Sequence, residues 1–248
     1  MIPLSDPDLV TRRRPFINIL IIVLCALVFF YELTLGEAES NIFFYKFGFI
    51  PEELTRGIAL TTVTIARRTY DVTSPIPNIL TIFTSMFIHG GWLHILGNML
   101  YLWVFGDNIE DRFGHLKYLL FYLAAGVFAS ATQILSGPAS KVPNIGASGA
   151  IAGVLGAYFV LYPFSRIRTM VFYFLITFVR IPAVFLLGFW FFLQFVSGVG
   201  SIGTSAQSEG IAYWAHIGGF VAGVGVGLIY KFLSRQTRPP APEAPVSP

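Results

Sequence analysis

The stretch GASGAIAGVLGAYFVLY, residues 146–162, decides the fold class of this chain. It contains no charged residue, and we predict a membrane-embedded helix over about Ser148–Tyr162. Gly149 and Gly153 stand four positions apart, a spacing that lets two membrane helices pack with their backbones close together. The same spacing recurs far along the chain at Gly219, Gly223 and Gly227.

The composition extends this interpretation to the whole chain. Of its 248 residues, 55% are hydrophobic and only 12% are charged, and its mean hydropathy is +0.70. Soluble domains carry about 25% charged residues, so a water-soluble fold could not cover this much apolar surface. We predict an all-α, polytopic membrane helix bundle of one domain, surrounded by a lipid bilayer. The net charge of +3 is modest and its basic residues flank apolar segments, so we expect no nucleic-acid partner.

Apolar runs divide the chain into six expected transmembrane helices. A polar segment, 1–14, precedes the six-helix domain, 15–234, and a Pro-rich tail, 235–248, expected to be disordered, follows it. The piece Met170–Val179 is too short to cross about 30 Å of hydrocarbon, so we expect it at the membrane interface. The six spans are expected at about Phe16–Leu35, Trp92–Phe105, Tyr118–Leu135, Ser148–Tyr162, from Pro182 onward, and Ile211–Leu233.

The basic residues predict how these helices are oriented. Six spans put both termini on one side of the membrane. All basic residues except Lys46, Arg56, Arg67, Arg68 and Lys141 fall on that side. Because Lys and Arg favour cytoplasmic loops, we expect both termini in the cytoplasm.

Polar residues from three spans are then expected at the same depth in the outer half of the membrane. Ser148 begins the fourth span, and His216 lies about 7 Å below the outer end of the sixth at 1.5 Å per residue. His94 and Asn98, four residues apart, share one face near the outer end of the second. Buried polar groups in lipid are costly, so this cluster indicates a functional site.

These residue types fit nucleophilic catalysis. Serine becomes a nucleophile when a base within hydrogen-bond reach takes its proton, and His216 could accept that proton and return it to a leaving group. Asn98, His94 and the backbone N–H of Ser148 could stabilise the developing oxyanion. No Asp or Glu lies near the outer end inside the second, fourth or sixth span. We therefore expect a Ser–His dyad in which packing, not a carboxylate, orients His216.

The same residues could instead have a structural or a metal-binding role. Taken singly, Ser148 and His216 could each serve only as a polar contact between helices. Alternatively, His89, His94 and His216 could bind zinc, but His89 and His94 are five apart and no His-Glu-x-x-His string occurs. We expect no metal and no cofactor.

The ordered set of motifs resembles the rhomboid intramembrane serine proteases. The motifs are His89-x4-His94-x3-Asn98, then Gly146-Ala147-Ser148-Gly149, then Ala215-His216-Ile217-Gly218-Gly219. The resemblance, to bacterial members in particular, covers roughly residues 12–235. It implies Ser148 as nucleophile, His216 as base, Asn98 and His94 in the oxyanion hole, and His89 and Gly146 as supporting residues.

The same resemblance implies a reaction, a partner and a location. The reaction is peptide-bond hydrolysis in or near transmembrane segments of other membrane proteins, without metal or cofactor. The location is a multi-pass position in a bacterial inner membrane, with the site toward the outer side. Two departures stand out: Ala152 occupies a position where some members carry an aromatic residue that stacks on the histidine, and no Trp-Arg pair occurs in the first long loop.

Two alternative functions share parts of this pattern. A non-catalytic relative that binds transmembrane helices would have the same fold, but that class tends to lose the Ser–His pair. A small transporter would spread polar residues through the midplane on broken, repeated helices. Here the polar residues gather at one end.

Overall fold

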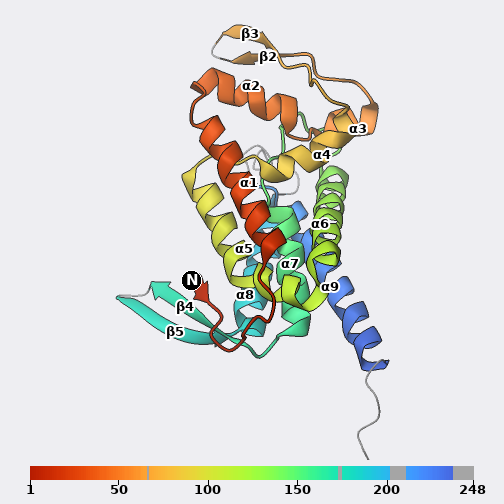
Figure 1. Cartoon of the computed structure of the whole chain (residues 1–248). Coiled ribbons are helices and arrows are strands. Elements are labelled where there is room, and N and C mark those ends of the chain that lie inside the picture. Colours follow the sequence, from red (N-terminus) through yellow and green to blue (C-terminus); the bar gives the residue numbers. More distant parts are fainter. Residues whose placement is uncertain (66, 173–174, 202–210, 237–248) are drawn as a thin grey trace, which may run out of the picture.

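The computed structural model describes residues 1–65, 67–172, 175–201 and 211–236, and most of these are helical (Figure 1). The long helices are α1 (Phe16–Glu32), α5 (Trp92–Phe113), α6 (His115–Ser136), α7 (Ser148–Leu161), α8 (Ala183–Gly200) and α9 (Tyr213–Gln236). Between α1 and α5, at the upper end of Figure 1, lie α2 (Glu37–Phe47), α3 (Pro51–Arg56), β2 (Thr62–Ile65), β3 (Arg68–Asp71) and α4 (Thr81–Thr84). Single 3-10 turns, Asn78–Leu80 and Ser85–Phe87, flank α4.

Several of these helices can cross a membrane by length and composition. Within the described residues, α6, α8 and α9 are long and apolar enough, and a fourth span results if Asn78–Phe87 is counted together with α5 across a bend of 82°. Two further apolar helices are shorter: α1 has 17 residues and α7 has 14. The chain is therefore a mostly helical membrane protein, while the six-span arrangement stays a prediction.

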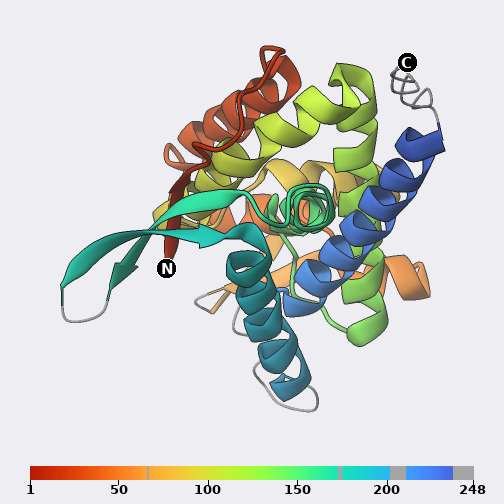
Figure 2. The same cartoon turned by 90° about the horizontal axis from the view of Figure 1, so that it is seen from below.

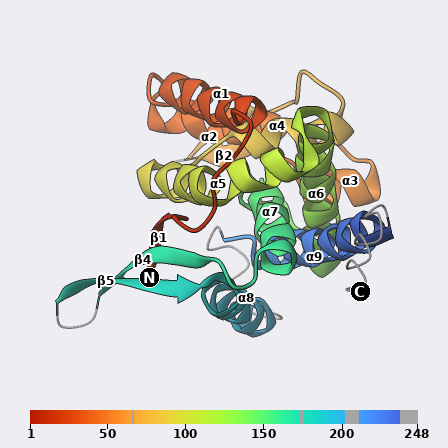
Figure 3. The same cartoon turned by 60° about the horizontal axis from the view of Figure 1, so that its bottom comes forward.

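The short helix α7 is the axis of the bundle. Every residue from Gly149 to Tyr158 is buried. Seen from below, α7 lies end-on among the other long helices (Figure 2), and Figure 3 places it between α6, α8 and α9. A helix that is apolar on all sides belongs in the core of a bundle, since it has no face to give to water.

Buried polar groups hold the first helix against the bundle. The Glu110 carboxylate accepts hydrogen bonds from the backbone N–H groups of Ile17 and Asn18, at 2.9 and 2.7 Å. These N–H groups have no partner inside α1, so an acid from α5 caps the helix. Asn18 in turn donates to the carbonyl of Leu102 and accepts from the hydroxyl of Tyr118. The sharp turn from α5 into α6 is made by Gly114, whose φ of +81° favours glycine.

The prediction of an all-α fold was wrong in part, because the described residues also form two small sheets. Strand β1 (Ile2–Ser5) pairs with β4 (Arg166–Phe172), which pairs with β5 (Ile176–Pro182), and all pairings are antiparallel. Met170–Phe172 and Ile176–Val179 of the apolar piece expected at the membrane interface thus belong to β4 and β5. Burial alternates along Arg166–Thr169 at the start of β4, as in a strand with one face covered. The second sheet is the β2–β3 hairpin in the first long loop.

Most helix boundaries agree with the predicted spans to within three residues, but α5 continues to Phe113, although the second span was expected to end at about Phe105. The fourth predicted span begins at Ser148, as α7 does, and the fifth begins next to Pro182, which is the N-cap of α8. Helix α9 runs to Gln236, two residues into the segment predicted as a disordered tail. The rest of that tail lies outside the described residues, as does most of Ser197–Gly210, predicted from its Gly and Ser content to be a mobile cap.

Candidate active site

Ser148 is held at the first position of α7 by the loop before it. Gly146 donates its N–H to the carbonyl of Ser85 at 2.8 Å, and Asn144 pairs with Phe49 as an isolated antiparallel bridge. Gly146 has φ +121°, and a Cβ there would lie 2.6 Å from Nε2 of His94. Glycine is therefore required at position 146 on both conformational and steric grounds. This requirement accounts for the glycine two residues before Ser148.

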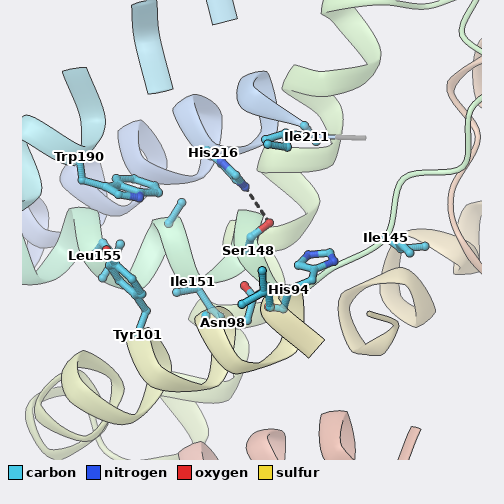
Figure 4. Close-up of a pocket in the computed structure, with 14 residues that line it drawn as sticks. His94, Asn98, Tyr101, Ile145, Ser148, Ile151, Leu155, Trp190, Ile211 and His216 are labelled. Carbon is cyan, nitrogen blue, oxygen red and sulfur yellow. Dashed lines mark hydrogen bonds between the residues drawn. The ribbon is translucent and has the colours of Figure 1, made fainter. Parts of the chain in front are cut away.

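His216 faces Ser148 because α7 and α9 pack backbone to backbone. A Cβ on Gly219 would lie 2.0 Å from the carbonyl oxygen of Gly149, and one on Gly223 would lie 1.9 Å from that of Gly153. Only glycine permits such contact. The glycines four positions apart on each helix had predicted this close packing. The result is a distance of 2.7 Å between Nε2 of His216 and Oγ of Ser148 (Figure 4). Both side chains are half-buried.

The second imidazole nitrogen of His216 has a partner that the sequence did not predict. Its Nδ1 lies 2.8 Å from the side-chain oxygen of Gln194 on α8. An amide oxygen only accepts, so Nδ1 carries the proton and Nε2 is left as the acceptor facing Ser148. Packing alone was expected to orient this ring; the structure adds a hydrogen bond. One signal was available, since Gln194 interrupts an otherwise apolar run on α8.

An aromatic ring also lies beside His216, from a different helix than the family pattern suggests. Position 152 is a fully buried alanine. The ring of Trp190, four residues before Gln194 on α8, has its centroid 5.9 Å from that of His216, with the planes tilted by 37°. Residues four apart share a helix face. Helix α8 therefore supplies both the polar and the aromatic neighbour of the histidine.

Asn98 and His94 lie across Ser148 from His216, both on α5 (Figure 4). Asn98 is buried, and one of its amide hydrogens is given to the carbonyl of His94 at 2.8 Å. Its second amide hydrogen can serve another acceptor. The N–H groups in the first turn of α7 also have no partner within the helix. The Asn98 amide and the first turn of α7 are therefore sources of hydrogen-bond donors in the neighbourhood of Ser148.

His89 lies behind this arrangement rather than in it. It is 1% exposed, its Nδ1 is 3.2 Å from the carbonyl of Phe87, and its backbone N–H donates to the carboxylate of Glu32. Its ring packs edge-on against that of His94 at a centroid distance of 5.1 Å. His89 thus supports His94 from behind the pocket wall. No group of three or more metal-ligating side chains gathers anywhere in the ranges that the structure describes.

Ser148, His216, His94 and Asn98 all line one cavity of about 480 Å³. The rest of its wall is mostly apolar, formed among others by Tyr101, Ile151, Leu155 and Trp190. Figure 4 shows these side chains on one side of the serine and His94 on the other. Chemically, the cavity offers a hydroxyl, an acceptor nitrogen in reach of its proton, and the polar side chains of Asn98 and His94, in an otherwise apolar setting.

Parts of this chain are similar in sequence to known proteins. Residues 77–232, more than half of the chain, match the family model described as "Rhomboid domain". The chain is 35% identical to "Rhomboid protease GluP" of Bacillus subtilis over 147 residues, which are 59% of this chain and 26% of that protein. It is 30% identical to "Rhomboid protein 1, mitochondrial" of Saccharomyces cerevisiae over 164 residues, 63% of this chain and 44% of that protein. The chain therefore spans less than half the length of these relatives.

Proposed function

The chain belongs to the rhomboid family, and from this premise we propose that it is an intramembrane serine endopeptidase. The observation that carries the proposal is the hydrogen-bonded series Gln194–His216–Ser148, with distances of 2.8 and 2.7 Å. A serine, a base in reach of its proton, and a third group orienting the base form the general pattern of an activated nucleophile. The homology to proteins named as rhomboid proteases supports the same reaction class.

In the proposed reaction, Oγ of Ser148 attacks the carbonyl carbon of a peptide bond while Nε2 of His216 takes the hydroxyl proton. The imidazolium then gives this proton to the leaving amine, and a water molecule repeats the cycle to release the acyl group. Gln194 accepts from Nδ1 throughout and so keeps the ring in one tautomer. The second amide hydrogen of Asn98, His94 and the N–H of Ser148 would stabilise the oxyanion.

We further propose that α1, α5, α6, α7, α8 and α9 form six spans, with both termini in the cytoplasm of a bacterial cell. Ser148 is at the N-terminal end of α7, and His94 is near the N-terminal end of α5. With this topology the cavity opens toward the outer side. At 1.5 Å per residue α7 is only about 21 Å long, which leaves its serine end below the membrane surface and in reach of water.

The proposed substrates are transmembrane segments of other proteins. A helical segment hides its carbonyls in hydrogen bonds, so it must unwind locally before Ser148 can attack. Segments containing Gly, Pro or other weak helix formers should therefore be cleaved preferentially. The mainly apolar wall of the cavity suits such a segment.

The decisive experiment offers a model transmembrane substrate to the purified protein. We expect cleavage by the wild type and a loss of at least about a thousandfold in kcat for Ser148→Ala and for His216→Ala. Ser136→Ala is the matched control, because the Ser136 hydroxyl bonds the carbonyl of Gln133 at the end of α6 and does not line the cavity.

A fluorophosphonate probe separates this proposal from a non-catalytic, helix-binding relative. We expect the probe to label the wild type and Ser136→Ala but not Ser148→Ala. If the wild type binds the substrate, leaves it intact and is not labelled, the protein is instead a helix-binding member of the family.

A further inference from the structure

The β4–β5 hairpin carries three arginines on one face. Side chains alternate between the two faces of a strand, and residues paired across strands share a face. The face with Arg166 and Arg168 is exposed, while Ile167 and Thr169 on the other face are fully buried. Arg168 is paired directly with Arg180 of β5. The exposed face therefore has two arginines at directly opposite positions of the hairpin.

This pair is not neutralised within the described part of the chain. Among the described residues, no Asp or Glu lies within ion-pair distance of Arg168 or Arg180. Arg168 instead lies over the ring of Phe178, with its guanidinium carbon 5.5 Å from the ring centroid. Two acids follow β1 next to the sheet: Asp6 accepts from the hydroxyls of Tyr158 and Ser165, and Asp8 accepts from the backbone N–H of Arg166. Like charges directly opposite on a sheet are destabilising, so the pair favours an external anion.

Apolar side chains continue the same face toward the tip of the hairpin. Met170 pairs with Phe178, and Phe172 pairs with Ile176. Phe172, Phe178 and Ile176 are 57%, 54% and 60% exposed. Figures 1 and 2 show the hairpin extending sideways from the lower end of the bundle, well clear of the helices. A basic strip next to an apolar strip is the pattern that a membrane surface complements.

We propose that this face of the hairpin binds the headgroups of anionic phospholipids. The Arg168–Arg180 pair would donate to a lipid phosphate, and the aromatic and aliphatic side chains would pack on the upper part of the acyl chains. The hairpin follows the C-terminal end of α7, and Ser148 is at the opposite end of that helix, about 21 Å away at 1.5 Å per residue. The lipid site is thus separate from the cavity and does not depend on the proposed protease activity.

The test compares nanodiscs of phosphatidylcholine alone with nanodiscs that also contain phosphatidylglycerol. Native mass spectrometry counts the lipids retained by the full chain, and thermal unfolding in both discs gives an independent measurement. We expect the wild type to retain phosphatidylglycerol preferentially and to unfold at a higher temperature when it is present. Each arginine contributes about a fivefold factor in affinity, so R168Q/R180Q should weaken the preference about 25-fold.

The direction in which R180Q changes the unfolding temperature distinguishes this site from a general effect of surface charge. Because R180Q removes a like-charge neighbour, it should raise the unfolding temperature in phosphatidylcholine alone while reducing the response to phosphatidylglycerol. R67Q/R68Q is the matched control, since it removes two neighbouring arginines from the other hairpin, β2–β3, and should leave the response intact.

The proposal is overturned if the wild type retains both lipids equally, or if R168Q/R180Q keeps the full preference. It is also overturned if free inorganic phosphate stabilises the wild type as strongly as the lipid does, since the ligand would then be a soluble anion. Every measurement can be repeated in the Ser148→Ala variant. The lipid-binding result can therefore be interpreted even if the protein proves not to be a protease.

Discussion

The side-chain oxygen of Gln194 lies 2.8 Å from Nδ1 of His216, and this contact joins α8 to the histidine that faces Ser148. It provides, from a neutral side chain, the orientation that a carboxylate provides in a Ser-His-Asp triad. Since Gln194 and Trp190 both belong to α8, any displacement of this helix would move both neighbours of the imidazole. The position of α8 therefore determines whether His216 is oriented to accept the proton of Ser148.

Replacing Gln194 by Met should lower kcat by roughly 10- to 100-fold with little change in KM. The substitution keeps the length of the side chain but leaves the Nδ1–H of His216 without an acceptor, a loss of about 1–3 kcal/mol. Gln194→Glu restores an acceptor and should recover most of the activity. Leu193→Met, on the exposed side of the same helix, is the control. Equal kcat values for Gln194→Met and wild type would rule out the positioning role.

Replacing Gly219 by Ala should separate α7 from α9. The added Cβ would lie 2.0 Å from the carbonyl oxygen of Gly149, so the helices must move apart, at about 1–3 kcal/mol of unfolding free energy. Because this contact sets the distance between Ser148 and His216, fluorophosphonate labelling should fall as well. Gly225→Ala on the same helix meets nothing within 4 Å. Thermal unfolding and labelling of both variants check the prediction, and similar losses in the two would contradict it.

Replacing Gly146 by Ala should abolish most activity through two separable effects. Its φ of +121° is unfavourable for alanine, and the new Cβ would lie 2.6 Å from Nε2 of His94. Gly57→Ala isolates the first effect, because Gly57 has φ +66° with nothing within 4 Å. We expect Gly57→Ala to lose about 1–2 kcal/mol of stability from left-handed backbone strain, and Gly146→Ala to lose about 1–3 kcal/mol, because its φ lies outside the left-handed helical region. Only Gly146→Ala should lose cleavage of the model substrate; an active Gly146→Ala would place His94 outside the reaction.

Asn98→Ala should reduce kcat by about 10²–10³-fold, the usual loss for one oxyanion-hole donor. The structure offers a close control in Asn41 on α2, whose amide bonds the carbonyl of Glu37 at 2.8 Å, as Asn98 bonds that of His94. Asn41→Ala removes the same local bond far from Ser148. If both variants cleave at the wild-type rate, Asn98 has only the local structural role that Asn41 has.

The sequence by itself determined the membrane class, most of the helix boundaries except the end of α5, and the polar residues worth testing. These depend on short-range properties: apolar runs long enough for lipid, a proline before α8, and small residues four apart on α7 and α9. The prediction that Ser148 and His216 come close followed from the same spacing. What failed locally was the segment around β4 and β5, where a short apolar run gives no periodicity that separates a strand from an interfacial helix.

Only the tertiary structure decided which side chain orients His216 and what covers it. Gln194 is 22 positions away in sequence, and its contact depends on the rotation of α8 about its own axis relative to α9. That rotation is set by the packing of the whole bundle, including the α7–α9 contact, and no local pattern records it. The pairing of Arg168 with Arg180 likewise depends on the register between β4 and β5. A shift of one residue in one strand would have placed the two arginines on opposite faces of the hairpin.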